Sequence, residues 1–278
     1  MPKFDAPEPL FVTLEFDQGS ARIAASKRTD AVVEVRPANS AEELDVRTAE
    51  QTKVTCADGK LVVKGPRKRS VFGRTGVIDV SVELPAGSDL HVTTPMADIA
   101  CEGRLGDCRI KTSFGDIQVD EVATANLRTG HGAVRADRIT GDAEVVASGT
   151  VAIETIAGAA TVKNSNGETT IGEVVGDLKV NAANGRIDVG TAQGGVDARS
   201  ANGSIRIGDV ARGRVVLQVA AGDIEVGIRE STAAWLDVHT GVGRVRNSLG
   251  AAEGPGDSAE TVEVRARTSV GDIDIRRP

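Results

Sequence analysis

The clearest candidate for chemistry in this sequence is a run of positive charge. The segment from Lys64 to Arg74 reads KGPRKRSVFGR and contains no acidic residue. A basic loop with an aromatic side chain suits an anionic lipid surface, an acidic protein partner or a nucleic-acid backbone. We therefore predict a partner-binding loop, with these candidate residues: Lys64, Arg67, Lys68, Arg69, Phe72 and Arg74.

The charge of the whole chain narrows the choice of partner. The 278 residues carry 33 Lys and Arg against 40 Asp and Glu, a net charge of −7. This balance favours solubility and argues against a nucleic-acid partner. We expect an unidentified protein partner or an anionic membrane surface, and the sequence is also compatible with a homo-oligomer.

Residues for catalysis are not grouped in any recognisable way. The three histidines, His91, His131 and His239, are widely spaced, and no Ser/His/Asp arrangement follows from the pattern. The chain has five Phe, one Trp and no Tyr, whereas a carbohydrate-cleaving β-helix needs aromatic platforms for sugar rings. We predict no catalytic residues, no metal ligands and no cofactor. We expect the single Trp, Trp235, to pack over a widened repeat.

Aspartates that follow glycines offer two readings. They are Asp98, Asp116, Asp223 and Asp272 in one series and Asp107, Asp142 and Asp177 in another. A stacked row of carboxylates is one way to hold calcium, but these acids skip repeats and calcium requires six to eight oxygens. We predict that they form turns.

The cysteines and the first residues bear on the compartment. Cys56, Cys101 and Cys108 are odd in number and widely spaced, which is typical of reduced thiols, and we expect Cys101 and Cys108 in the core. The segment Met1–Pro9 has three prolines and two acids, so it lacks the apolar stretch of a secretory signal. We predict a cytoplasmic protein, with peripheral membrane contact as the alternative.

A repeat of 17 to 19 residues must position all of these groups. Glycines precede an apolar-x-apolar triplet at near-constant spacing: Gly115, Gly132, Gly149, Gly167, Gly185, Gly203, Gly222, Gly243 and Gly271. A second series of glycines lies half a repeat later: Gly106, Gly141, Gly158, Gly176, Gly194 and Gly213. Apolar residues at every second position indicate strands with one buried face. Each repeat is thus two short strands and two tight corners.

This pattern predicts an all-β fold: a single-stranded β-solenoid, parallel β-helix-like, of about ten coils. A left-handed hexapeptide helix needs a small apolar residue every six positions, and Gln193 and Arg199 break that rule. An antiparallel meander or barrel remains as an alternative, since Asn-Gly is a hairpin signal. Asn166, Asn184 and Asn202 precede their glycines and are expected to stack as an amide ladder.

One outward row of the solenoid is expected to cancel its own field. It contains Asp188, Arg206, Glu225, Arg246 and Asp274. On successive coils these charges would alternate in sign and favour pairing. We predict a solvated face that sets the register and does not bind a charged polymer.

Residues 1–86 lack the repeat and are predicted to form a β-rich cap, with residues 87–278 as the solenoid. Strand-like runs lie at Leu10–Phe16, Arg22–Ala25, Val32–Arg36, Lys53–Cys56, Lys60–Lys64 and Val77–Leu84, with a hairpin at Ala57–Gly59 and a helical turn at Ser40–Leu44. Residues 248–260, rich in Gly and Pro, are predicted to be an extruded loop. The last residues, Asp274–Pro278, are expected to blunt the open edge.

The repeats resemble a bacterial β-strand-repeat domain of unknown function known as the "putative adhesin" family. The resemblance rests on units such as Ser200–Ile207 and Gly271–Ile275, and on the strand-rich stretch at Ala57–Val63 that precedes the repeats. It covers roughly residues 10–276 and implies a β-solenoid without an established catalytic site. No catalytic residue is carried over.

Three functions follow in order of preference. The first is a non-enzymatic scaffold or binding protein, adhesin-like by resemblance, intracellular and linked to envelope stress, that presents the basic loop and the 248–260 loop. The second is a self-polymerising structural solenoid, since open β ends invite stacking. The third is a β-helix carbohydrate-active enzyme, which would require a cleft with clustered acids.

Overall fold

The computed structural model describes residues 2–66, 75–250 and 260–278. Strands dominate these ranges, and the described residues include a single helix, so the predicted all-β class is confirmed. The chain forms two compact units, Met1–Asp137 (unit 1) and Arg138–Pro278 (unit 2). The division does not test the capping role expected of residues 1–86, which stays a prediction.

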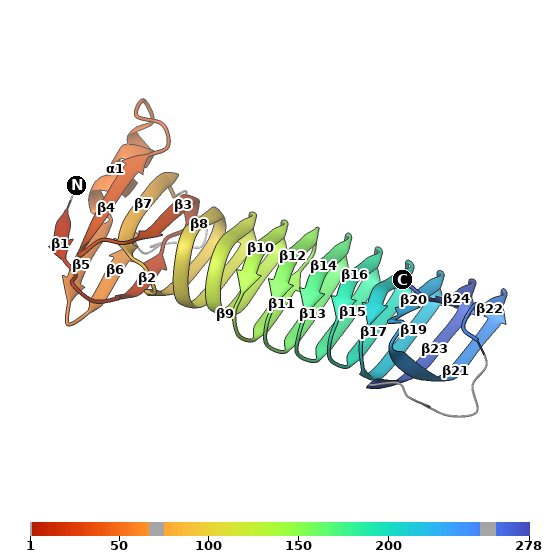
Figure 1. Cartoon of the computed structure of the whole chain (residues 1–278). Helices are drawn as coiled ribbons and strands as arrows, with labels where there is room; N and C mark the ends of the chain where they lie inside the picture. Colours follow the sequence, from red (N-terminus) through yellow and green to blue (C-terminus); the bar gives the residue numbers. More distant parts are fainter. Residues whose placement is uncertain (1, 67–74, 251–259) are drawn as a thin grey trace. The chain divides into compact units, whose positions relative to one another are not determined.

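Unit 2 consists of coils, each built from two short strands (Figure 1). The first strands of the coils form one parallel sheet: β11 (Ala143–Ala147), β13 (Ala160–Asn166), β15 (Leu178–Asn184), β17 (Val196–Asn202), β19 (Gly213–Ala221), β21 (Thr232–Val242) and β23 (Glu260–Val270). The second strands form another: β12 (Val151–Ile156), β14 (Thr169–Val174), β16 (Ile187–Ala192), β18 (Ile205–Val210), β20 (Ile224–Ile228), β22 (Val245–Asn247) and β24 (Ile273–Arg276). The parallel pairing confirms the solenoid and excludes the meander.

The core of unit 2 is made of apolar side chains stacked in register between the two sheets. In the second sheet Ile171, Val189 and Ile207 are direct neighbours, and each is fully buried. Removing such surface from water contributes about 25 cal/mol per Å², so each added coil stabilises the coil beside it. The core of unit 2 is therefore built by stacked aliphatic side chains and does not depend on aromatic residues.

Glycine is required at the corner where coils approach most closely. Gly185 has φ +117°, and a Cβ built there would lie 2.1 Å from the carbonyl oxygen of Gly167 on the adjacent coil. The Asx side chains of these corners bind the neighbouring coil. Asp177 Oδ1 accepts the backbone N–H of Gly195 at 2.9 Å, and Asn202 Nδ2 donates to Asn184 Oδ1 at 3.0 Å. The predicted turn role of Asp177 and the stacked amides at Asn184 and Asn202 are thus confirmed, whereas Asp98 and Asp107 lie within the strand Asp89–Phe114 and do not form turns.

The coils of unit 2 are not stacked in sequence order. β23 pairs with β19 on one side and β21 on the other, and β24 likewise lies between β20 and β22. The last coil in the sequence is therefore inserted next to last, and β21–β22 is the terminal coil. The expectation that Asp274–Pro278 blunts the open edge is wrong, because β24 has a neighbour on both sides.

Unit 1 also contains an inserted coil, here at the start of the chain. Its elements are β1 (Lys3–Asp5), β2 (Phe11–Glu15), β3 (Gln18–Ser26), β4 (Asp30–Pro37), α1 (Glu43–Gln51), β5 (Lys53–Ala57), β6 (Lys60–Lys64), β7 (Ile78–Pro85), β8 (Asp89–Phe114) and β9 (Ile117–His131), while β10 (Val134–Ile139) crosses the division. β2 lies between β6 and β8, and β3 lies between β7 and β8, all in parallel. The coil that comes first in the sequence is thus also the second coil from its end of the stack, inside the coil made by β6 and β7.

Antiparallel strands cover the outer coil of unit 1. β5 pairs with β6 through the predicted hairpin, where Asp58 and Gly59 both have positive φ. β4 pairs with β7, and β1 pairs with β4. Because antiparallel strands do not continue the coil, they end the solenoid at this side. All six predicted strand runs of this region are confirmed within one to four residues at each end.

Helix α1 is longer and later than the predicted turn at Ser40–Leu44. It contacts β4 and β7, and its buried face is polar, with Asp45 and Thr48 each 6% exposed. Asp45 Oδ1 accepts the backbone N–H of Val77 at 2.8 Å, and Thr48 Oγ1 accepts that of Gly76 at 3.2 Å. The helix therefore satisfies backbone groups where the chain enters β7. Neither α1 nor any other described segment is a helix of the length and apolarity needed to cross a membrane.

Candidate binding groove

Most of the predicted basic loop lies outside the described residues. Arg67, Lys68, Arg69, Phe72 and Arg74 all fall within 67–74. Lys64 ends β6, and its Nζ lies 2.5 Å from a carboxylate oxygen of Glu15 on β2. The loop therefore stays a prediction, and at Lys64 the charge is already shared with an acid. The predicted 248–260 loop is likewise outside the described residues from 251 to 259.

The cysteines and histidines have structural environments. Cys101 and Cys108 are buried in the core of unit 1, as expected. A hydrogen bond with the Cys108 thiol, together with burial, raises the pKa of Cys101 well above its ordinary value, which keeps the thiol protonated. The His131 ring stacks on Phe114 with a centroid distance of 4.9 Å.

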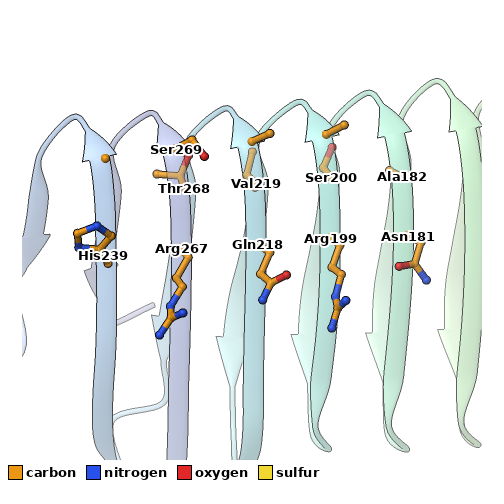
Figure 2. Close-up of a pocket in the computed structure, with 13 residues that line it drawn as sticks. Asn181, Ala182, Arg199, Ser200, Gln218, Val219, His239, Arg267, Thr268 and Ser269 are labelled. Carbon is orange, nitrogen blue, oxygen red and sulfur yellow. The ribbon is translucent and has the colours of Figure 1, made fainter.

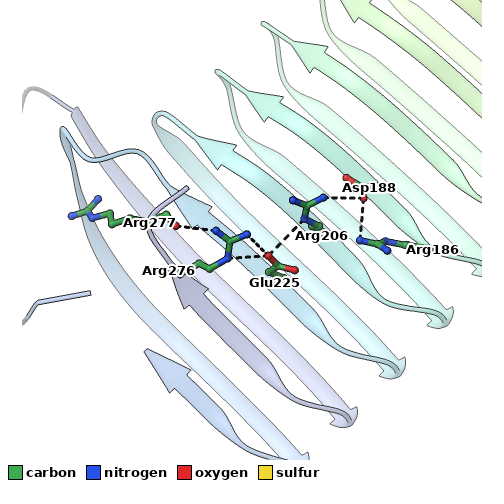
Figure 3. A network of polar contacts seen from close by, with 6 residues as sticks. All are labelled: Arg186, Asp188, Arg206, Glu225, Arg276 and Arg277. Carbon is green, nitrogen blue, oxygen red and sulfur yellow. Dashed lines mark hydrogen bonds and ion pairs between the residues drawn. The ribbon is translucent and has the colours of Figure 1, made fainter. Parts of the chain in front are cut away.

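The second sheet of unit 2 carries the row that was expected to cancel its own charge (Figure 3). Arg206 lies 3.5 Å from Asp188 and 3.6 Å from Glu225, which confirms alternation over these three coils. The inserted coil then places Asp274 beside Glu225, and Arg246 follows beyond it. Strict alternation is therefore wrong at the end of the row. Arg276 compensates, because its Nε donates to Glu225 at 3.0 Å.

The first sheet of unit 2 differs, because a groove of about 670 Å³ crosses it. The groove passes over β15, β17, β19, β23 and β21 (Figure 2). Among the described residues that line it, none carries a carboxylate. Its surface therefore presents positive charge, amides and hydroxyl groups.

One side of the groove is a row of long polar side chains with one residue on each strand. We call the following residues the polar row: Asn181, Arg199, Gln218, Arg267 and His239, preceded on β13 by Lys163. Direct register places these residues side by side, at the strand spacing of about 4.8 Å. From Lys163 to Arg267, positive and amide side chains alternate. Figure 2 shows the row crossing the strands.

The rest of the groove is lined by small side chains. Two residues beyond the polar row, the exposed positions are Ala201, Ala220, Ser269 and Gly241 on successive strands. Because none of them extends far from the sheet, the surface is hollow beside the long side chains. The depth of the groove thus follows from alternating long and short outward residues on each strand.

The two arginines of the row are held by acids at its outer side. Arg199 Nε lies 3.1 Å from Asp197 Oδ1, and an Arg267 guanidinium nitrogen lies 3.4 Å from Asp237 Oδ2. All four side chains are between 36% and 61% exposed, so these ion pairs are weak and exchange readily. The acids orient the guanidinium groups but lie outside the groove lining, which leaves N–H donors for a ligand.

The terminal coil provides the end of the groove through His239. The adjacent Trp235 is 57% exposed on the outward face, 5.8 Å from the Arg265 guanidinium carbon. The expectation that Trp235 packs over a widened coil is therefore wrong. Among the described strands, β21 pairs with β23 alone, so the ring has a neighbouring strand on one side and none on the other.

Unit 1 carries a second groove, of about 660 Å³, with the opposite charge. Glu34, Asp79, Asp98 and Asp116 are among its lining residues. Three of these carboxylates already accept hydrogen bonds: Asp79 from the Ser20 hydroxyl at 2.7 Å, Asp98 from the Asp116 N–H at 2.9 Å, and Asp116 from the N–H of residue 133 at 2.8 Å. These acids build turns and strand contacts, so this groove is the weaker candidate.

Sequence reasoning missed the polar row because its spacing is irregular. The steps from residue 163 to 181, 199 and 218 are 18, 18 and 19, but the next member in space is Arg267, from the inserted coil. His239 is the next member after Arg267 in space, although His239 comes before Arg267 in the sequence. The signal present in the sequence was a polar or basic residue four positions before each of six corner glycines: Gly167, Gly185, Gly203, Gly222, Gly243 and Gly271.

Comparison with known proteins identifies the family. Residues 12–276 match the model of the family described as Toastrack DUF4097. No curated protein matches the chain. Similar solved structures include an adhesin from Bacteroides fragilis, called "putative", with 12% identity, coverage of 99% of this chain and 95% of that one, and a TM-score of 0.40.

A cell adhesion protein from Clostridium sporogenes, also called "putative", has 12% identity, coverage of 100% and 98%, and a TM-score of 0.28. The family model spans all the coils of both units, and its match confirms the resemblance seen in the repeats. The chain therefore belongs to the Toastrack DUF4097 family, a β-solenoid family of unknown function.

Proposed function

We propose that this protein is a non-enzymatic binding scaffold that holds an elongated ligand across its coils, in the groove of unit 2. The observation that carries the proposal is the register: five strands each place one polar side chain on the same line. A ligand lying along this line meets an equivalent contact on every coil. Many weak, evenly spaced contacts favour a polymer over a compact small molecule.

The rigidity of the solenoid supports this role. On each strand the residue directly before the polar row points into the core. Three of these residues, Ala198, Leu217 and Ala266, are fully buried. Such a sheet does not have to be ordered on binding, so little conformational entropy is lost when the ligand docks. The non-enzymatic part of the proposal is supported by the chemistry of the lining. Its described residues include one imidazole, that of His239, and no carboxylate, so they do not supply the pair of carboxylic acids that glycoside hydrolysis uses.

The test blocks the groove without changing charge. Ala220→Phe places a ring in the hollow beside Gln218, and Thr170→Phe adds the same ring to the exposed face of the other sheet. The full chain is run through gels containing anionic, neutral or cationic linear polysaccharides and polypeptides. We expect at least one polymer to retard the parent protein and the Thr170→Phe control, but not the Ala220→Phe variant.

Two results would contradict the proposal. One is that no polymer of any charge retards the protein, or that both phenylalanine variants behave alike. The other is that the retained polymer becomes shorter during incubation, as size-exclusion chromatography would show. Shortening would restore the enzyme alternative.

A further inference from the structure

We propose that the ligand of the groove is a linear anionic polysaccharide with one acidic group on every second sugar ring. This inference rests on the proposed function and specifies its ligand. The acidic groups would meet Lys163, Arg199 and Arg267, and the uncharged rings between them would meet the amides of Asn181 and Gln218.

The spacing of charge along the polar row supports this ligand. Lys163, Arg199 and Arg267 lie on alternate strands, because Asn181 and Gln218 occupy the strands between them. Two strand spacings amount to about 9.5 Å. The two-ring repeat of an extended polysaccharide is close to this distance, so successive acidic groups reach successive cations without a change of register.

The chemistry of the side chains also fits. A guanidinium group offers several N–H donors in a plane and binds a carboxylate or sulfate through paired hydrogen bonds. The amides of Asn181 and Gln218 each offer a donor and an acceptor, which suits the hydroxyl and acetamido groups of uncharged rings. The hollow beside the row, formed by residues such as Ala201 and Ala220, leaves room for the thickness of a ring.

Other linear polyanions match less well. Side chains on one face of an extended peptide repeat about every 6.7 Å, which does not match the cations. A polyproline helix repeats near 9.3 Å, but its usual grooves are lined by aromatic residues, and the described lining here has no Phe or Trp. Nucleic-acid phosphates lie closer together than the cations of the row, so their charges do not match its spacing.

The ion pairs at the row explain how the cations stay in place before binding. Asp197 and Asp237 hold Arg199 and Arg267 from outside the groove. Because exposed pairs of this kind contribute little, an incoming acidic group competes with them at low cost. The affinity for the ligand should therefore fall as the salt concentration rises, because salt screens the attraction between these exposed charges and the acidic groups.

The experiment uses isothermal titration calorimetry of the full chain with oligosaccharides of defined length. The probes are hyaluronan, with acid on alternate rings; polygalacturonate, with acid on every ring; uncharged cello-oligosaccharides; and polyglutamate. We expect hyaluronan to bind most tightly. Arg199→Gln should weaken it about tenfold, and Arg199→Gln with Arg267→Gln about a hundredfold, since each substitution removes a charged hydrogen bond.

A matched control and a gain of function sharpen the test. Arg186→Gln with Arg206→Gln removes the same charge from the other sheet and should leave the affinity for hyaluronan unchanged. Gln218→Arg adds a cation where an uncharged ring is expected, so it should increase binding of polygalacturonate more than binding of hyaluronan. The variants lie on exposed positions except at Arg206, which is partly exposed, and thermal melts establish that all of them are folded.

The possible results separate this inference from the proposed function. Equal losses in the two double variants, or equal binding of charged and uncharged sugars, would overturn the inference. Preference for polyglutamate that the groove variants abolish would also overturn it, while leaving the groove as a binding site. If no polymer binds in the calorimeter or in the gels, both proposals fail.

Discussion

In unit 1 the coil made by β2 and β3 lies between two coils that come later in the sequence. In unit 2 the coil made by β23 and β24 lies between two coils that come earlier. Each of these two coils is thus paired on both edges, which protects it against fraying. A terminal segment with two neighbours loses two ladders of hydrogen bonds when it detaches, rather than one.

The coils beyond these insertions differ. In unit 1, β5 and β4 pair with the outer edges of β6 and β7. In unit 2, across residues 138–250 and 260–278, no strand pairs with the outer edge of β21 or β22. The burial of the outer coil follows this contrast, because Leu61 on β6 is fully buried while Leu236 on β21 is only partly buried and Val245 on β22 is 43% exposed.

The difference shows what pairing with an antiparallel strand contributes to the outer coil of a solenoid. Coils stacked in register bury one another, but the last coil always has one uncovered side. Unit 1 covers that side with antiparallel strands, which cannot be extended by a further coil. Unit 2 leaves backbone groups and apolar side chains at its end, which is the feature behind the polymerising alternative.

The largest effects are expected where a glycine contacts the next coil. A Cβ at Gly19 would lie 1.7 Å from the Ile78 carbonyl oxygen, and one at Gly243 would lie 2.0 Å from that of Gly271; both glycines have positive φ. We predict that Gly19→Ala costs about 3 kcal/mol or more, because β7 is held by β4 and cannot move. Gly243→Ala should cost about 1–2 kcal/mol, since the terminal coil can shift outward.

The measurement for this pair is urea denaturation followed by circular dichroism, with amide hydrogen exchange to locate the loss. Exchange should rise across β3 and β7 in the first variant and only across β21 and β22 in the second. Equal destabilisation by the two alanines would mean that the terminal coil of unit 2 is held as firmly as that of unit 1.

An equal truncation at both ends gives an intermediate effect. Leu61→Ala removes a fully buried side chain that lies between Val12 on β2 and Cys56 on β5, and it should cost about 2–5 kcal/mol. Leu236→Ala removes a partly exposed side chain and should cost about 1 kcal/mol. The comparison uses the same method, and a cost for Leu236→Ala as large as that for Leu61→Ala would show that its outer side is covered in solution.

The solenoid was predictable because its signals are local. Gly185 indicates a corner and Ile187 indicates the start of a strand, only two residues later, and the same signals recur along the repeats. The order of the coils was not predictable, because Gly271–Ile275 carries the same pattern as Gly222–Val226. Any coil with this pattern can stack on any other. The sequence therefore does not specify where the last coil is inserted, and the clearest irregularity it shows is the long spacing from Gly243 to Gly271.

The groove was missed, and the helix was predicted too short and too early, for related reasons. The polar row depends on which coils are neighbours, and Arg267 joins Gln218 only through the insertion. Helix α1 has a polar buried face, whose Asp45 serves the backbone of Val77, a contact across 32 residues. Hydrophobic periodicity indicates helices that pack by apolar burial, and it cannot reveal one that packs by hydrogen bonds.

The smallest predicted effect depends on pH and concerns the antiparallel strand β4 of unit 1. Asp30, at the start of β4, lies 2.7 Å from Arg28 Nε and 3.0 Å from Lys3 Nζ. The hydrogen bond from Arg28, then that from Lys3, lowers the pKa of Asp30 from 3.8 to about 2. Since the folded pKa is depressed, the carboxylate stabilises the fold above about pH 4, and this contribution is lost as pH falls toward 2. Asp30→Asn should therefore lower the urea midpoint slightly at pH 7, by an amount that shrinks as the pH falls through about 2 and vanishes only below it. In an Arg28→Gln background the same substitution should have a smaller effect at every pH, because the dominant partner is gone. A difference that is constant from pH 7 to pH 2 would show that Asp30 acts through its shape and not through its charge, and that β4 is held over the outer coil by its backbone pairing alone.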